Sequence, residues 1–319
     1  MEPIALDIHV HQIPIDPGRL DGMPGVRWHA DAGQIEIDGH KVAFASLFKP
    51  AALLEWLSTN AVEHAWVSIP PPAYRPQLNA DASRQWVDYL NDGIRTLCAR
   101  HKERLSPMVH LPVEHPPLCA EIAQQAIGRG DKRFSMSAGT SGTILSSAAY
   151  TPLWETLAGA RAFLFIHPAE LMKDIRLDPF YLNNLVGNPY ETGLAATHLV
   201  YGRVLERFAD MTVCLAHGGG ATAMVAGRLQ RGLVTQRPGI DQAMLAPSEV
   251  LRRVTVDCIL HSPSALELAE QCFGREHIVF GSDWPFPMGL PKPHEQLANV
   301  APDKRRRILV DNPRALAKA

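Results

Sequence analysis

The 319-residue sequence has few cysteines and no pair of them in a CxxC motif. The five are widely scattered: Cys98, Cys119, Cys214, Cys258 and Cys272. An odd, dispersed set argues against a disulfide framework, and the absence of close pairs argues against a cysteine zinc site. The sequence therefore predicts a protein of a reducing compartment.

Long apolar runs and an excess of one charge are also missing. Polar or charged residues interrupt every apolar run before membrane-spanning length, and the opening MEPIALDIHVH has neither a basic n-region nor a cleavage site. A formal net charge of -2 gives no basic field for nucleic acid or an anionic membrane. We expect a soluble, cytoplasmic protein that binds neither.

Short apolar runs alternate with helix-like segments along the chain. Proline opens four of these segments, at Pro50, Pro152, Pro263 and Pro313, where the first turn of a helix tolerates it. A doubly wound sheet normally has a glycine-rich turn after its first strand, and HVHQIPID is not one. The eight runs predict an α/β fold, a single (β/α)8 TIM-type barrel over residues 1–319. They are residues 4–11, 64–70, 105–112, 133–139, 162–168, 211–217, 253–259 and 277–283.

One connection is too long for an ordinary loop between a strand and a helix. Residues 14–49 contain QIEIDGHKVAF, two alternating runs around Asp38 and Gly39, which is a hairpin signal. The pattern predicts a small hairpin inserted after strand 1, over the mouth of the barrel.

Histidine and aspartate occur where several of the predicted strands end. Strand 1 ends at His9 and His11, on the same face, while strands 5, 6 and 8 end at His167, His217 and Asp283. Any one of them could be a buried structural histidine or a loop residue. Chemistry in a TIM barrel occurs at these strand ends, and imidazole with carboxylate suits a zinc-like divalent metal.

His110, also near a strand end, is assigned no role beyond structure. Trp284 and Phe286 follow Asp283 and are predicted to line the pocket, although single aromatic residues would serve equally in a core.

Four motifs together resemble the amidohydrolase superfamily, in the branch typified by aminocarboxymuconate-semialdehyde decarboxylase. They are DIHVH at 7–11, LFIHP at 164–168, CLAHGGG at 214–220 and VFGSDWPFPMG at 279–289. The resemblance extends through most of the chain. It implies one divalent metal, zinc or alternatively manganese, bound by His9, His11, His167 and Asp283. It also implies that His217 is the acid/base, so His217 and Asp283 are the predicted catalytic residues. The strand 4 segment RFSMSAGTSG lacks the lysine that a second metal would require.

The resemblance also implies residues that bind substrate. Arg228 matches an arginine that contacts substrate, in some members across a homodimer interface, and Lys41 falls where another arginine is typical. Asn184 falls where a tryptophan is typical. Lysine keeps the charge of arginine but loses its planar fork. The two departures favour a related carboxylated aromatic or muconate-like substrate over aminocarboxymuconate semialdehyde itself.

The activity implied is non-oxidative decarboxylation by a metal-dependent carboxy-lyase. A hydrolase or hydratase acting on a lactone, an amide or an activated alkene would use the same ligands, so the motifs leave that alternative open. A non-catalytic barrel would be expected to lack at least one of the four ligands, and none is missing.

Overall fold

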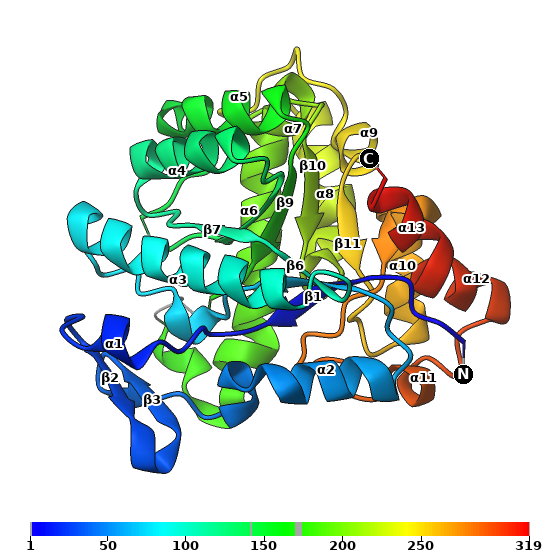
Figure 1. Ribbon diagram of the computed structural model, residues 1–319. Helices are drawn as coiled ribbons and strands as arrows, with labels where there is room; N and C mark the ends of the chain where they lie inside the picture. Colours follow the sequence, from blue (N-terminus) through cyan, green and yellow to red (C-terminus); the bar gives the residue numbers. More distant parts are fainter. Residues whose placement is uncertain (1, 141, 170–173, 319) are drawn as a thin grey trace. The chain divides into compact units, whose positions relative to one another are not determined.

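The computed structural model describes residues 2–140, 142–169 and 174–318 (Figure 1). The chain forms two units, residues 1–110 with 280–319 and residues 111–279, and each is described by itself. Among the described residues, no helix is both long enough and apolar enough to span a bilayer.

The first unit is built on parallel strands in the order β1-β5-β6. They comprise β1 (Asp7–His11), β5 (Ala65–Ser68) and β6 (Leu105–Pro107). The other side of β1 receives the segment that follows the last strand, because the Asp283 N–H donates to the His9 carbonyl (2.8 Å) and the His11 N–H donates to the Trp284 carbonyl (3.0 Å). Every residue of β1 is buried.

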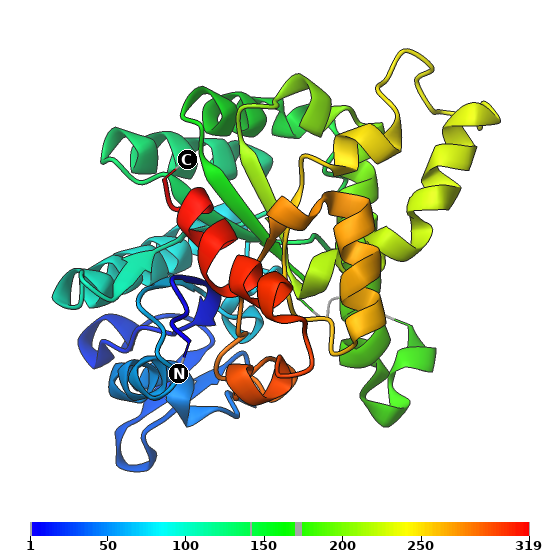
Figure 2. The same ribbon diagram turned by 90° about the vertical axis from the view of Figure 1, so that its right-hand side faces the viewer.

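Two helices of this unit begin at a proline and at a capping asparagine, the first of them at the predicted Pro50. Pro50 opens α2 (Pro50–Thr59), and the Asn79 side chain caps α3 (Ala80–Arg100) by accepting the Ala82 N–H. Near the C-terminus, α12 (Pro302–Arg306), the π-helical η10 (Arg307–Asp311) and α13 (Asn312–Leu316) follow one another without a break, as a single rod (Figure 2).

Between β1 and α2 lies a small antiparallel sheet in the order β2-β3-β4, after the short α1 (Pro17–Leu20) (Figure 1). Its strands are β2 (Val26–His29), β3 (Gln34–Ile37) and β4 (His40–Lys41). β3 and β4 pair across Asp38 and Gly39, whose φ angles of 49° and 82° suit a tight hairpin turn. Its predicted place over the mouth of the barrel stays a prediction.

The second unit contains parallel strands in the order β12-β11-β10-β9-β8. They are β8 (Arg133–Ser137), β9 (Phe163–His167), β10 (Thr212–Leu215), β11 (Thr255–Asp257) and β12 (Ile278–Val279). The short strand β7 (Val109–Leu111) includes the boundary between the two units. The pairs from β8 to β12 are parallel. Fully buried runs such as FLFIH are typical of parallel sheets covered on both faces.

The main helices of this unit are α4 (Pro116–Gly128), α5 (Thr151–Gly159), α6 (Asn188–Tyr201), α8 (Thr222–Val234) and α10 (Pro263–Phe273). Each of the eight predicted runs contains an observed strand. The third is split into β6 and β7 at Met108. Pro152, Pro263 and Pro313 lie in the first turns of α5, α10 and α13, as predicted.

An ion pair joins the inserted sheet to the body of the first unit. Arg75, with a side chain only 5% exposed, donates to both carboxylate oxygens of Asp38 (2.7 and 2.8 Å) and to the Pro24 carbonyl (2.7 Å). Burial raises the pKa of Asp38, but the hydrogen bonds and charge of Arg75 outweigh it and leave that pKa below its usual value.

We predict that Asp38→Asn lowers the free energy of unfolding by about 1–3 kcal/mol at pH 7, because a buried guanidinium loses its carboxylate partner. A depressed folded-state pKa gives stability that is present above the unfolded-state pKa, about 3.9, and is lost as the pH falls through the folded-state value. The difference between wild type and variant should therefore shrink below about pH 4. Urea unfolding at pH 7 and pH 3 measures it. Asp31→Asn, at an exposed aspartate of the same insertion, is the control, and an equal loss at both pH values would contradict the prediction.

Candidate functional site

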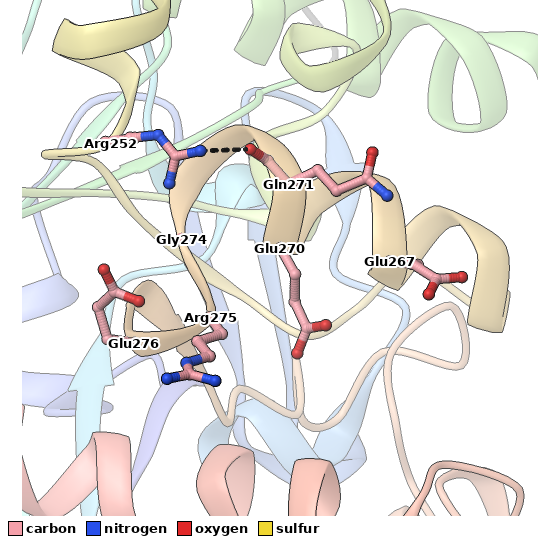
Figure 3. Close-up of a pocket in the computed structure, with 7 residues that line it drawn as sticks. All are labelled: Arg252, Glu267, Glu270, Gln271, Gly274, Arg275 and Glu276. Atoms are coloured by element: carbon pink, nitrogen blue, oxygen red, sulfur yellow. Dashed lines mark hydrogen bonds between the residues drawn. The ribbon is translucent and has the colours of Figure 1, made fainter.

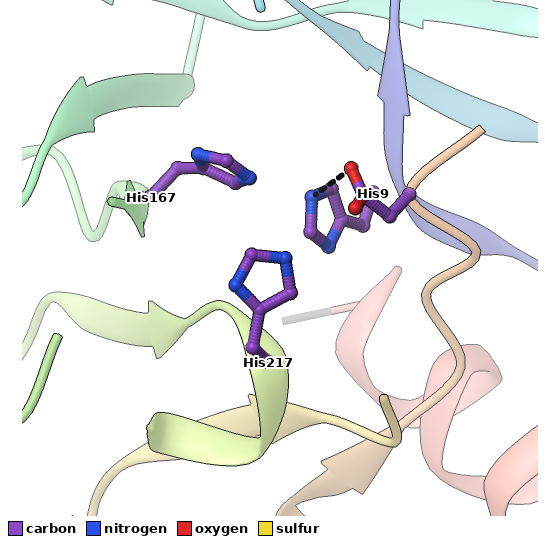
Figure 4. Close-up of side chains that lie close together, drawn as sticks. His9, His167 and His217 are labelled. Atoms are coloured by element: carbon purple, nitrogen blue, oxygen red, sulfur yellow. Dashed lines mark ion pairs between the residues drawn. The ribbon is translucent and has the colours of Figure 1, made fainter. Parts of the chain in front are cut away.

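Three ligand-type atoms of the first unit converge on one point. His9 Nε2 lies 3.1 Å from His11 Nε2 and 3.3 Å from Asp283 Oδ1, the contact dashed in Figure 4, and His11 Nε2 lies 3.2 Å from the same oxygen. Both histidines are fully buried and Asp283 is 5% exposed. The predicted strand-end residues of β1 and of the segment after β12 therefore form a nearly equilateral triangle.

The triangle has the dimensions of a metal site. Two ligands at about 2.0–2.1 Å from a tetrahedral zinc ion lie about 3.3–3.4 Å from each other. Sides of 3.1, 3.2 and 3.3 Å are close to one face of such a tetrahedron. Imidazole nitrogens and a carboxylate oxygen are also the expected donors. These residues fit a small divalent cation.

Neighbouring groups orient the members of the triangle. Asp7, buried two residues before His9 in β1, accepts the N–H groups of His9 and Ser282 at Oδ1, both at 3.0 Å. Burial raises the pKa of Asp7 to about 7 although these hydrogen bonds lower it. On β5, Ser68 Oγ lies 3.0 Å from His11 Nδ1, which leaves Nε2 to face Asp283.

The chain turns sharply around Asp283. Its φ is 58°, and the Leu290 N–H donates to the Ser282 carbonyl at 2.7 Å. Gly289 passes so close that a Cβ there would lie 2.1 Å from the Ser282 carbonyl oxygen. The last glycine of VFGSDWPFPMG is therefore required by this close approach.

Aromatic side chains border the triangle on one side. The Phe286 ring lies 5.6 Å from the His11 ring, and Phe44, from the insertion, lies 5.3 Å from Phe286. Trp284 instead packs 6.4 Å from Trp56 of α2 and is 7% exposed. Phe44 could not be predicted as a neighbour of the site, because a single phenylalanine in a loop forms no recognisable motif.

The second unit brings together the other two predicted histidines. His167, the last residue of β9, and His217, two residues after β10, have ring centroids 4.9 Å apart in an edge-to-face arrangement (Figure 4). His167 Nδ1 lies 2.6 Å from the Pro168 carbonyl, so Nδ1 holds the proton of the neutral ring and Nε2 offers a lone pair. In the pairing of β8 with β9, Ser137 lies opposite His167, so this position holds a serine and not the lysine that a second metal would require.

Asp257, at the end of β11, fixes the backbone of His217. Its Oδ2 accepts the His217 N–H and its Oδ1 accepts the Gly218 N–H, both at 2.9 Å. Asp257 lies 40 residues after His217, and no sequence motif links the two positions.

The two predicted substrate cations lie at the surface. Arg228 is exposed on α8, and Lys41 is exposed on β4. Their contacts with substrate stay predictions.

His110, which was predicted to have a structural role, is buried, and its ring stacks on Tyr74 with the centroids 4.7 Å apart. Its backbone N–H donates to Asn91 Oδ1 at 2.7 Å. Burial lowers its pKa to about 3, so the ring is neutral.

A surface pocket of about 350 Å³ lies elsewhere in the second unit, around the end of α10 (Figure 3). Its lining is Arg252, Glu267, Glu270, Gln271, Gly274, Arg275 and Glu276, and it includes none of the predicted site residues.

Comparison with known proteins defines the class of the molecule. Residues 70–317 match the amidohydrolase family, and the chain belongs to that family. Among curated relatives, it is 25% identical to the 2-amino-3-carboxymuconate-6-semialdehyde decarboxylase of Dictyostelium discoideum over 93% of this chain and 86% of the relative.

Solved structures define the fold. IDCase from Metarhizium anisopliae, in apo form, superposes with a TM-score of 0.82 at 19% identity, over 99% of this chain and 97% of that one. A variant 5-carboxyvanillate decarboxylase from Novosphingobium aromaticivorans, with bound manganese and 3-methoxy-4-hydroxy-5-nitrobenzoic acid, gives 0.79 at 14% identity, over 99% and 97%. The fold is the TIM-type barrel of amidohydrolases, as predicted.

Proposed function

We propose that this protein is a metal-dependent, non-oxidative decarboxylase of a carboxylated aromatic or muconate-semialdehyde-like compound. The observation that supports it most directly is the triangle of His9, His11 and Asp283, which fits a divalent cation. It occurs in an amidohydrolase whose relatives include enzymes named as decarboxylases.

The metal ligands of this proposal are His9, His11, His167 and Asp283. Amidohydrolase-type decarboxylases bind a divalent metal, and we propose zinc here, with manganese as the alternative because it is bound in the similar Novosphingobium enzyme. A bound cation would supply positive charge that orients and polarises a carboxylated substrate. His167 qualifies as a ligand because its Nδ1 is committed to the Pro168 carbonyl.

His217 is the proposed proton donor, next to His167. In decarboxylation the bond between the carboxyl carbon and its neighbour breaks, CO2 leaves, and the electron pair that stays behind takes a proton. An imidazolium can give that proton and recover it from water, because histidine titrates near neutral pH. Asp283 is the catalytic carboxylate beside the metal in this assignment.

The remaining substrate contacts are assigned by charge and position. Arg228 and Lys41 would bind carboxylate groups, Arg228 in bidentate fashion. Phe286 would contact the planar part of the substrate, since its ring already lies 5.6 Å from His11. Trp284 would contribute through its packing on Trp56 and hold the segment around Asp283.

Water addition to a lactone, an amide or an activated alkene is the second candidate function. The same ligand set would serve a hydrolase or hydratase. The relatives named as decarboxylases favour carbon–carbon cleavage.

A homodimer is the proposed assembly. Of the twelve exposed large apolar side chains among the described residues, seven lie between Ile175 and Leu194. Exposed apolar side chains concentrated in one segment favour an interaction site there, and Met224 and Val234 are further exposed apolar residues on α8.

The first prediction from this proposal concerns metal content. Purified protein should contain about one equivalent of divalent metal, and His9→Ala should lose it because one corner of the triangle disappears. His217→Ala should keep the metal and lose turnover. Elemental analysis beside an activity assay measures both. A metal content unaffected by His9→Ala would refute the ligand set, and activity retained by His217→Ala would exclude the proposed proton donor.

The second prediction concerns the reaction. A panel of 2,6-dihydroxybenzoate, 5-carboxyvanillate, 6-methylsalicylate and 2-amino-3-carboxymuconate 6-semialdehyde takes its members from the names of similar enzymes. At least one member or close analogue should release CO2, with one solvent hydrogen appearing on the carbon that lost it. Absence of CO2 from every member, together with hydrolysis of a lactone control, would favour the second candidate function.

The third prediction concerns assembly. Sedimentation should give a mass of about 70 kDa, twice the chain mass of 35.1 kDa. Leu185→Glu with Tyr190→Glu should shift the protein toward the monomer, because charge would enter an apolar interface. Leu268→Glu, at an exposed leucine of α10, is the control. A monomeric wild type would contradict the proposal.

A further inference from the structure

The turn that presents His217 has an unfavourable backbone. His217, Gly218, Gly219 and Gly220 all have positive φ, at 54°, 61°, 77° and 57°. Three of the four are glycines, which adopt positive φ freely. His217 has a Cβ, which makes positive φ unfavourable. A histidine in the left-handed region persists only when its surroundings hold it there.

Packing around the glycines leaves the turn little room to relax. A Cβ at Gly218 would lie 2.3 Å from the Leu260 side chain, and one at Gly219 would lie 2.8 Å from Phe273. A Cβ at Gly220 would lie 2.5 Å from the Pro189 carbonyl oxygen. These contacts confine the three glycines, but they do not act on His217 itself.

The group that acts on His217 is the Asp257 carboxylate. It is 0% exposed and uses both oxygens: Oδ2 accepts the His217 N–H, and Oδ1 accepts the N–H groups of Gly218 (2.9 Å) and Ile259 (3.1 Å). Consecutive N–H groups that converge on one anion form a nest, and such charge-assisted bonds are stronger than neutral ones. The carboxylate thus compensates the unfavourable conformation of the turn.

We propose that Asp257 is the positioning residue of His217: its buried carboxylate holds the strained backbone so that the imidazole stays where it transfers the proton. This inference rests on the proposed function of His217. Asp257 acts on the main chain, through the N–H groups of His217 and Gly218. Without the carboxylate, the buried N–H groups would lose their acceptor, and the turn would move to find another.

The first test needs no substrate. In Asp257→Asn, one oxygen becomes an NH2 group that cannot accept, so the amide hydrogen of His217, of Gly218 or of both should exchange at least about tenfold faster in the metal-loaded enzyme. Thr255→Val, which removes another buried polar group of β11, is the matched control and should leave these two rates unchanged. Unchanged exchange in Asp257→Asn would overturn the proposal. If that variant does not fold, Asp257→Ser, with a smaller neutral acceptor, gives the same comparison.

The second test measures turnover of the panel member that releases most CO2. Asp257→Asn should lower kcat by about 100-fold, the loss expected from a misplacement of about 1 Å, with KM changed less than about threefold. Its metal content should equal that of wild type, and the solvent isotope effect on kcat should rise because proton transfer slows. A loss confined to KM or to metal content would overturn the positioning role.

A double variant separates this inference from the proposed function. If Asp257 acts through His217, adding Asp257→Asn to His217→Ala should cause no further loss of kcat. If the kcat losses of the two single variants multiply in the double variant, the inference is overturned, while His217 remains the proton donor. Full activity of His217→Ala would instead refute the proposed function, and the exchange rates would still report on the backbone contact.

Discussion

A buried carboxylate that accepts backbone N–H groups is the interaction on which the histidine cluster of each unit depends. In the first unit, Asp7 accepts the N–H groups of His9 and Ser282 and so fixes the two segments that form the triangle. In the second, Asp257 binds those of His217 and Gly218. In both cases the strand end supplies the position and the carboxylate supplies the orientation, because a buried N–H group is costly to leave unpaired.

The insertion contributes to the same site by different means. It brings Phe44 against Phe286, which lies beside His11, and the ion pair of Asp38 with Arg75 ties its hairpin to the body of the unit. Loops placed on a rigid barrel can vary while the strand ends stay constant.

Much of the fold and part of the site could be predicted from the sequence. Apolar runs bounded by proline and glycine report local structure, so the eight strands and the helix starts at Pro50 or Pro263 could be located. The resemblance to amidohydrolases could be recognised because each motif is a short contiguous stretch, and the family match over residues 70–317 confirmed it.

Contacts between distant segments could not be predicted. The register that brings Asp257 to His217, the packing of Trp284 on Trp56 and the approach of Phe44 to Phe286 depend on tertiary structure. The third strand splits at Met108, directly after Pro107, which has no N–H to donate to a sheet. Asp7 could have been found, since it lies two residues before His9 in the same motif.

The hydrogen bonds between β1 and the segment around Asp283 also determine when the site can form. His9 and His11 leave the ribosome early, whereas Asp283 follows 272 residues after His11. At about 5–20 residues per second, this delay is roughly 14–55 s. The triangle cannot close until Asp283 has been synthesised, so any cation held by these three side chains would bind only after the 272 residues that follow His11 have been added.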